Sequence, residues 1–249
     1  APDGSLELFT TSPVELGPPW SPSDAPGTRP PGTCWELPAG TPVELLADDA
    51  RRVGAPCPTL VQLGRDLDDR DVYVDLEALE ALEIGGPGDQ ADAVVAAIAS
   101  TLAASVLAEV TTLVGVGVPD AAFLGHRLHR PVRDVQRAFE AAADAIGTTA
   151  AADRSTFELR ARVTSGEAWE PAVILAGSAV GTVTPPQRRT GLAVVSASPI
   201  HGPSSRLAPD GDGWSLLPIG LRLVPVGLTP RDVAAIDALV CVPEPEPAG

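Results

Sequence analysis

Apolar runs of strand length alternate along this chain with segments whose apolar residues recur at helical spacing. Three of these runs show no helical stripe, which is typical of strands buried on both faces of a parallel sheet. They cover residues 111–118, 171–177 and 192–198. A shorter run over residues 82–84 leads directly into a glycine-rich turn. The pattern therefore predicts buried strands that are separated by longer connections.

Helical periodicity predicts three helices, over residues 89–106, 132–146 and 230–240. In the first, Val94, Ile98 and Leu102 fall on a single stripe, as expected of a helix that packs one face on a sheet. The last begins with Thr229 as its N-cap and Pro230 at its first position, which is a favourable start for a helix. Helices that alternate with buried strands indicate an α/β fold.

Two further regions show the strict alternation of a β-hairpin. Residues 59–64 and 71–76 alternate on either side of a polar turn, and residues 205–226 alternate around a turn at 209–213. We therefore expect an α/β fold with a mainly parallel sheet flanked by helices. A small antiparallel hairpin or edge should lie near the C-terminus.

Length and composition divide the chain further. With 249 residues and 44% hydrophobic content, the chain can form one large core. We expect residues 1–58, which are rich in proline, to be extended and to pack on the α/β domain of residues 59–242. The Pro/Glu tail at 243–249 is expected to be disordered. The chain starts at Ala1, which we interpret as a fragment boundary or a processing site.

The charge of the chain excludes several functions. A net charge of −16 opposes direct binding of nucleic acid or of an anionic membrane surface. No apolar run reaches the length of a membrane helix without polar interruption. Cys34, Cys57 and Cys241 are odd in number and lack a C-x-x-C spacing, so neither a disulfide framework nor a zinc site is indicated. We expect a cytoplasmic domain, either free or as the cytoplasmic part of a membrane-anchored protein.

The glycine-rich turn is the strongest candidate for a functional site. It lies between a predicted strand and a predicted helix, which is the context of a phosphate-binding loop. That loop reads G-x-x-x-x-G-K-[ST], yet the positions of its lysine and hydroxyl fall within residues 89–92 here, and the chain contains no lysine. The predicted ligand-binding residues of this degenerate loop are Gly85, Gly86, Gly88 and Asp89. No cofactor and no catalytic residue is predicted, and an ordinary glycine turn is the alternative.

The hairpin, the loop and the following helix, over residues 59–106, resemble the ATPase core of FtsK/SpoIIIE-type translocases and their type VII secretion relatives. The resemblance implies a P-loop-like sheet of the RecA/FtsK kind. Two departures from the family pattern are severe. The loop lacks the lysine and the serine, and the Walker B candidate at 171–177 ends in Ala176 and Gly177 instead of an Asp-Glu pair. Magnesium would have no ligand on either element, so the resemblance implies a pseudo-ATPase.

A second resemblance covers nearly the whole chain. Residues 35–38, 43–46, 60–76 and 214–221 resemble the central region of actinobacterial multidomain regulators, which carry LysM repeats and a bacterial transcriptional activator domain. This resemblance implies a regulatory or relay module within a larger transcriptional-regulator protein. Its partners would be other domains of the same polypeptide or a separate protein.

Arginines gather in one stretch of this acidic chain. Four of the 17 basic residues are Arg127, Arg130, Arg133 and Arg137. We predict that this stretch is a surface loop with a basic patch that contacts an acidic partner surface or an intramolecular carboxylate. His126 and His129 lie in the same stretch, but no further Cys, Asp or Glu nearby completes a metal site.

Two alternative functions remain open from the sequence. One is a sensor domain for a small molecule or a nucleotide. The other is a hydrolase whose site is formed around His126, Arg127 and His201. The chain has three histidines and no G-x-S-x-G elbow, which argues against the hydrolase.

Overall fold

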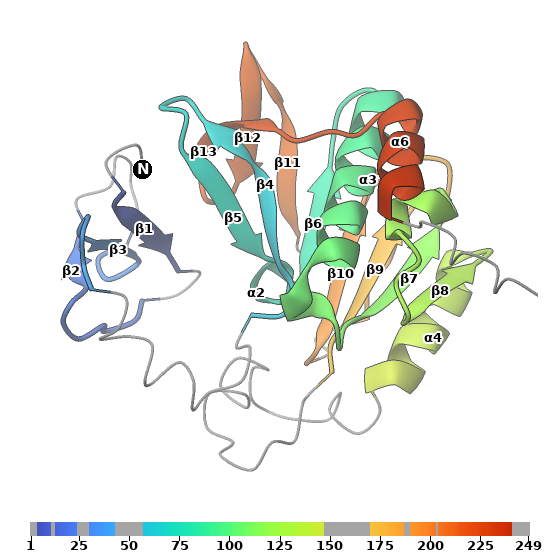
Figure 1. The fold of residues 1–249 in the computed structure, drawn as a ribbon, viewed down its shortest axis with the longest axis horizontal. Coiled ribbons are helices and arrows are strands. Elements are labelled where there is room, and N and C mark those ends of the chain that lie inside the picture. The colour runs from blue at the N-terminus through green and yellow to red at the C-terminus, as the bar shows by residue number, and fades with distance from the viewer. Residues whose placement is uncertain are drawn as a thin grey trace, which may run out of the picture.

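A ten-stranded sheet organises most of the chain in the computed structural model (Figure 1). The structure describes residues 4–10, 13–23, 30–42, 57–146, 170–186, 190–202 and 204–240. The strand order in the sheet is β5-β4-β13-β12-β11-β6-β10-β9-β7-β8. The strands are β4 (Leu60–Asp66), β5 (Asp71–Asp75), β6 (Ala81–Ile84), β7 (Thr112–Val116), β8 (His129–Val132), β9 (Ala172–Ala176), β10 (Leu192–Ser196), β11 (Ser205–Asp210), β12 (Gly213–Leu217) and β13 (Leu221–Pro225).

The sheet is mixed and mostly parallel, as the sequence predicted. Six neighbouring strands, from β11 to β8 in the order above, pair in parallel. The other four strands, β12, β13, β4 and β5, pair antiparallel with their neighbours. The predicted C-terminal hairpin is present as β11–β12. It lies inside the sheet and not at an edge, because β13 pairs with β4 and so joins the first hairpin to the parallel strands.

Helices flank the sheet on both faces (Figure 1). They are α2 (Leu76–Leu79), α3 (Gly88–Ala104), α4 (Val135–Ile146) and α6 (Pro230–Val240), with the 3-10 helices η1 (Val106–Ala108) and η2 (Asp120–Phe123). On one face α3 buries Val95 and Ile98 in a core that also contains Phe123 of η2 and Val233 of α6. On the other face α4 buries Ala142 in a second core. Because side chains alternate along each central strand, every one of these strands contributes to both cores.

The three predicted helices are confirmed as α3, α4 and α6. The start of α4 differs from the prediction, which placed a surface loop at 127–137 and a helix from 132. Residues His129–Val132 instead form β8, which pairs in parallel with β7. A four-residue strand that contains a proline has almost no pattern of its own, so its pairing with β7 could not be seen in the sequence.

Within the predicted N-terminal segment, the described residues form a separate three-stranded antiparallel sheet. Its strands are β1 (Leu6–Phe9), β2 (Ser21–Pro22) and β3 (Cys34–Leu37), in the order β1-β3-β2. A salt bridge of 3.1 Å between Glu7 and Arg70 connects this sheet to the turn between β4 and β5. Residues 243–249 lie outside the described part of the chain. Every helix in the described ranges is too short or too polar to span a bilayer.

Gly64 permits the close pairing of β4 with β13, next to an irregularity in the pairing of β4 with β5. A Cβ atom at position 64 would lie 2.2 Å from the carbonyl oxygen of Val224. Because that neighbour is backbone, we expect Gly64→Ala to lower the free energy of unfolding by about 1–3 kcal/mol. Urea denaturation measures this change. Gly213→Ala is the control, since a Cβ there would be 3.5 Å from its nearest neighbour, and an equal effect of both variants would contradict the prediction.

Candidate functional site

The predicted ligand-binding residues lie together at the carboxyl end of β6. Gly85 follows the strand and donates its N–H to the carbonyl of Leu207 at 2.8 Å. Gly86 has a φ of 107°, which is open to glycine and strained for other residues. α3 begins at Gly88, so Asp89 belongs to its first turn. The arrangement of strand, glycine turn and helix is thus the one expected of a P-loop-like element.

Side chains from the C-terminal hairpin pack against this glycine turn. A Cβ atom on Gly85 would lie 3.1 Å from the Cβ of Ala208 and 3.3 Å from the guanidinium of Arg206. A Cβ atom on Gly86 would lie 3.3 Å from the indole of Trp214. Both glycines therefore leave room for β11 and β12 to pack closely on the loop, and the positive φ of Gly86 favours glycine there whether or not a ligand binds.

Asp92 holds the end of β9 against α3. Its Oδ1 accepts a hydrogen bond of 2.7 Å from the backbone N–H of Ser178, and its Oδ2 accepts one of 2.7 Å from the Ser178 hydroxyl. Asp92 lies within the stretch where a phosphate-binding loop would carry its lysine and hydroxyl. Here α3 supplies the carboxylate of Asp92, and the segment after β9 supplies the hydroxyl of Ser178. The two groups bind each other.

Two buried serines close the ends of β9 and β10. The Ser198 hydroxyl donates to the carbonyls of Gly177 and Ser178 at 3.0 and 2.9 Å. The Ser196 hydroxyl donates to the carbonyl of Ser198 and accepts from its N–H. Both side chains are essentially inaccessible to solvent. The hydrogen bonds of Ser198 thus link the segments that follow β10 and β9, and no hydrogen bond in the described residues joins either hydroxyl to a basic side chain.

Glu83 is a polar group at this end of the sheet that the sequence did not single out. Its Oε2 accepts a hydrogen bond of 2.8 Å from the N–H of Ile200, and its Oε1 is 3.2 Å from Nε of Arg206. Arg206 also lies beside Gly85, so the fold brings a cation to the loop. The parallel pairing of β11 with β6 places Arg206 opposite Glu83, and neither residue type nor spacing indicated that pairing.

The predicted basic patch lies along β8 and the start of α4. We call Arg127, Arg130, Arg133 and Arg137 the basic edge, and all four are exposed. Arg137 forms a salt bridge of 2.8 Å with Glu140. Within the described ranges the other three arginines have no ion pair. Arg127, Arg130 and Arg133 therefore present positive charge to solvent on an acidic protein.

The histidines do not assemble into one site. His126 and His129 are half-buried near Phe123, which belongs to the core on the α3 face. The imidazole of His129 stacks on the Phe123 ring, with 3.7 Å between the ring centroids. The backbone N–H of His201 donates to the backbone carbonyl of Val183, whose side chain belongs to the core on the α4 face. Among the described residues, no hydrogen bond, ion pair or ring contact joins His201 to His126 or Arg127, the residues of the alternative hydrolase. No group of three metal-ligating side chains occurs among the residues that the structure describes.

The fold and the turn after β6 define an α/β domain with a P-loop-like arrangement. No protein-family model and no curated protein matches the chain. Among solved structures, the cytoplasmic domain of the type VII secretion ATPase EccC of Thermomonospora curvata matches with a TM-score of 0.40 and 13% identity, covering 69% of this chain and 26% of that one. EccC ATPases 2 and 3 of the same organism, in complex with a signal sequence peptide, match with a TM-score of 0.41 and 14% identity.

The second match covers 81% of this chain and 45% of the EccC chain. This chain thus spans less than half the length of either structure. A TM-score below 0.5 does not allow residues or roles to be transferred. The fold class therefore rests on the strand order and pairing described above.

The clamp formed by Asp92 and Ser178 yields a stability prediction. Asp92→Ala removes a carboxylate that accepts two hydrogen bonds, and we expect the free energy of unfolding to fall by about 2 kcal/mol. Asp89→Ala, in the same turn of α3, removes an exposed carboxylate that interacts only with the helix dipole and should cost less than about 1 kcal/mol. Urea denaturation of both variants tests the difference. Equal losses would show that the clamp contributes nothing specific.

His129 yields a prediction about pH. Burial lowers its pKa, although Asp120 acts in the opposite direction, and its Nε2 is buried without a hydrogen-bond partner in the described part of the chain. Because the folded state binds the proton more weakly, stability should be intact above the ordinary pKa of about 6.5 and should fall as the pH drops below it. His129→Phe, which keeps the stacking, should reduce this loss between about pH 7.5 and about pH 5.5. Urea denaturation at both pH values measures it, and a loss in His129→Phe as large as in the unchanged protein would contradict the prediction.

Proposed function

We propose that this chain is a non-catalytic, P-loop-like domain that acts through contacts with other protein surfaces. The observation that carries the proposal is the packing of the glycine turn. Arg206, Ala208 and Trp214 lie against Gly85 and Gly86, and the helix that follows offers carboxylates where a nucleotide-binding loop offers cations. The turn thus has a structural explanation that does not involve a phosphate.

The chemistry of phosphoryl transfer supports the absence of catalysis. Such transfer depends almost entirely on positioning the phosphates and neutralising their charge. Asp89 and Asp92 would repel a triphosphate at the first turn of α3, and Asp92 is already bound to Ser178. The end of β9 carries Ala176 and Gly177, so it offers no side-chain ligand for magnesium.

The proposed setting is a regulatory or relay module in a larger cytoplasmic protein, with other domains of the same polypeptide or a separate protein as partners. An actinobacterial transcriptional regulator with LysM repeats is the setting that the short sequence resemblances favour. The net charge of −16 supports a protein partner over nucleic acid or an anionic membrane. The exposed basic edge supports a partner surface that carries carboxylates.

A second candidate function is an anion or nucleotide sensor, and the position of Arg206 favours it. Its guanidinium lies beside Gly85 and is 57% exposed. It is therefore accessible to a bound anion in place of the missing lysine. Glu83, at 3.2 Å, competes with any anion for this guanidinium, which makes the sensor the weaker of the two candidates.

Titration calorimetry with ATP and GTP in the presence of Mg²⁺, together with a phosphate-release assay, tests both candidates. We expect neither binding heat nor turnover. Binding without turnover that is lost in Arg206→Ala but retained in Arg231→Ala would support the sensor. Turnover that depends on the chain would overturn the non-catalytic proposal. Arg231 is the matched control because it is an exposed arginine at the start of α6.

A further inference from the structure

The turn between β4 and β5 lies at one end of the sheet (Figure 1) and carries an excess of carboxylates. We call residues 65–71 the acidic turn; its charged residues are Arg65, Asp66, Asp68, Asp69, Arg70 and Asp71. Arg65 and Arg70 form salt bridges within the turn, but two guanidinium groups cannot neutralise four carboxylates. The side chains of Asp68 and Asp69 are 75% and 78% exposed. The acidic turn therefore presents negative charge to solvent.

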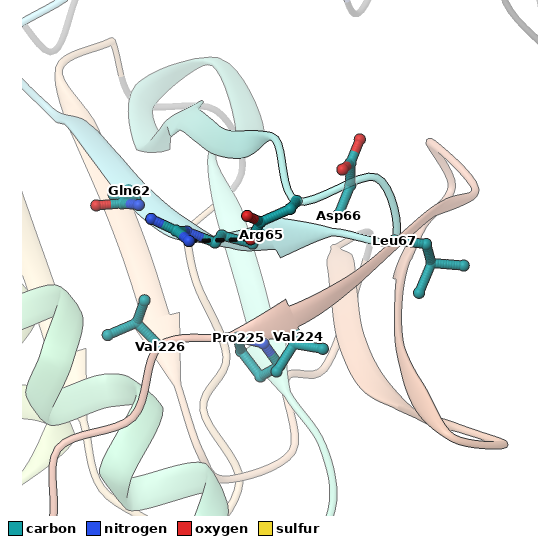
Figure 2. A pocket seen from close by; sticks show the side chains of 8 residues that line it. Gln62, Arg65, Asp66, Leu67, Val224, Pro225 and Val226 are labelled. Carbon is teal, nitrogen blue, oxygen red and sulfur yellow. Dashed lines mark hydrogen bonds and ion pairs between the residues drawn. The ribbon is translucent and has the colours of Figure 1, made fainter. Parts of the chain in front are cut away.

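An open groove of about 550 Å³ lies beside the acidic turn (Figure 2). Val224, Pro225 and Val226, at the end of β13, line it together with Gln62, Arg65 and residues of the turn. Leu67 extends from the tip of the turn and is 63% exposed, and Val224 is 58% exposed. Exposed apolar side chains that are rimmed by charged residues are typical of a protein contact surface.

The opposite end of the same sheet carries the four exposed arginines of the basic edge. β8 is the last strand in the sheet order, farthest from β5, which borders the acidic turn. The basic edge runs along β8 and into α4, with Arg127, Arg130 and Arg133 unpaired in the part of the chain that the structure describes. Pro131 is exposed between two of these arginines. This edge therefore offers cations together with an apolar side chain.

We propose that the basic edge of one copy docks on the acidic turn and groove of a second copy, so that the protein associates head to tail. Charge complementarity identifies the occupant, because every copy carries both surfaces at the two ends of one sheet. The contact is heterologous, so it produces a ring or an open chain and not a two-fold dimer. The inference rests on the interaction module proposed above, yet nucleotide turnover would remove that function and leave self-association intact.

The dependence of association on salt distinguishes this contact from non-specific association of the chain. Copies with a net charge of −16 repel one another, and added salt screens that repulsion and would favour non-specific association. Added salt weakens a contact between opposite charges, because it screens their attraction. Raising the ionic strength from about 0.01 M to about 1 M shortens the Debye length from about 30 Å to about 3 Å. Sedimentation equilibrium of the full chain should therefore show association at low salt that is lost at high salt.

Single substitutions test the location of the contact. We expect Arg130→Ala to weaken self-association by roughly fivefold, the upper range for one exposed charge pair. Arg231→Ala removes the same charge from an exposed position on α6 and should leave association within about twofold of the unchanged protein. Leu67→Ser should weaken association as well, because it removes the apolar side chain at the groove. Monomers at every concentration at low salt, or equal effects of Arg130→Ala and Arg231→Ala, would overturn the proposal.

Mixing two variants tests the head-to-tail direction. The double variant Arg130→Ala/Arg133→Ala keeps the acidic turn but weakens the basic edge. Asp68→Asn/Asp69→Asn keeps the basic edge but weakens the acidic turn. Each variant alone therefore lacks one of the two complementary surfaces and should remain largely monomeric. A mixture restores one complementary contact per pair and should yield a 1:1 heterodimer that does not grow further. Circular dichroism checks that both variants fold. A mixture that stays monomeric, or one that grows into larger assemblies, contradicts the proposed contact.

Discussion

The parallel pairing of β11 with β6 is the constraint on which the rest of the structure depends. Through this pairing the N–H of Gly85 binds the carbonyl of Leu207, and Arg206 lies opposite Glu83. On one side of β6 the sheet continues through the parallel strands, and on the side of β11 it continues through the antiparallel ones. Without this pairing the antiparallel strands β11, β12, β13, β4 and β5 would form a sheet separate from the parallel strands. The same pairing also places side chains of β11 and β12 beside the glycine turn.

The carboxyl ends of the parallel strands are where open α/β sheets bind ligands, and here they are tied together by internal hydrogen bonds. Asp92 binds Ser178, while Ser198 binds the carbonyls of Gly177 and Ser178. Each of these groups would need to exchange its partner before it could hold a phosphate or a metal. A buried polar group gives up such a partner only at a cost of about 1–3 kcal/mol. The hydrogen bonds thus favour stability of the sheet over ligand binding at this end.

The sequence predicted the elements well and their partners poorly. Buried runs, helical stripes and the Thr229 cap identify the central strands and α6, because each signal is local. The pairing of β13 with β4 joins residues far apart in the chain and depends on Gly64, whose role is visible only when Val224 lies against it. β8 was missed because its pairing with β7, and not its own pattern, makes it a strand. At the candidate site, the glycines were found from composition, whereas Glu83 and Arg206 emerged only from strand pairing.

The composition of the turn can be explained from this packing. Gly85 and Gly86 let Ala208 and Trp214 of the neighbouring hairpin approach closely, and the positive φ of Gly86 favours glycine there. This packing is the same with or without a bound phosphate, whereas a lysine and a magnesium ligand contribute only when a phosphate is present. The glycines of this turn are thus explained by packing alone. A glycine-rich turn between a strand and a helix is therefore evidence about packing first, and evidence about nucleotide binding only when its cations are present.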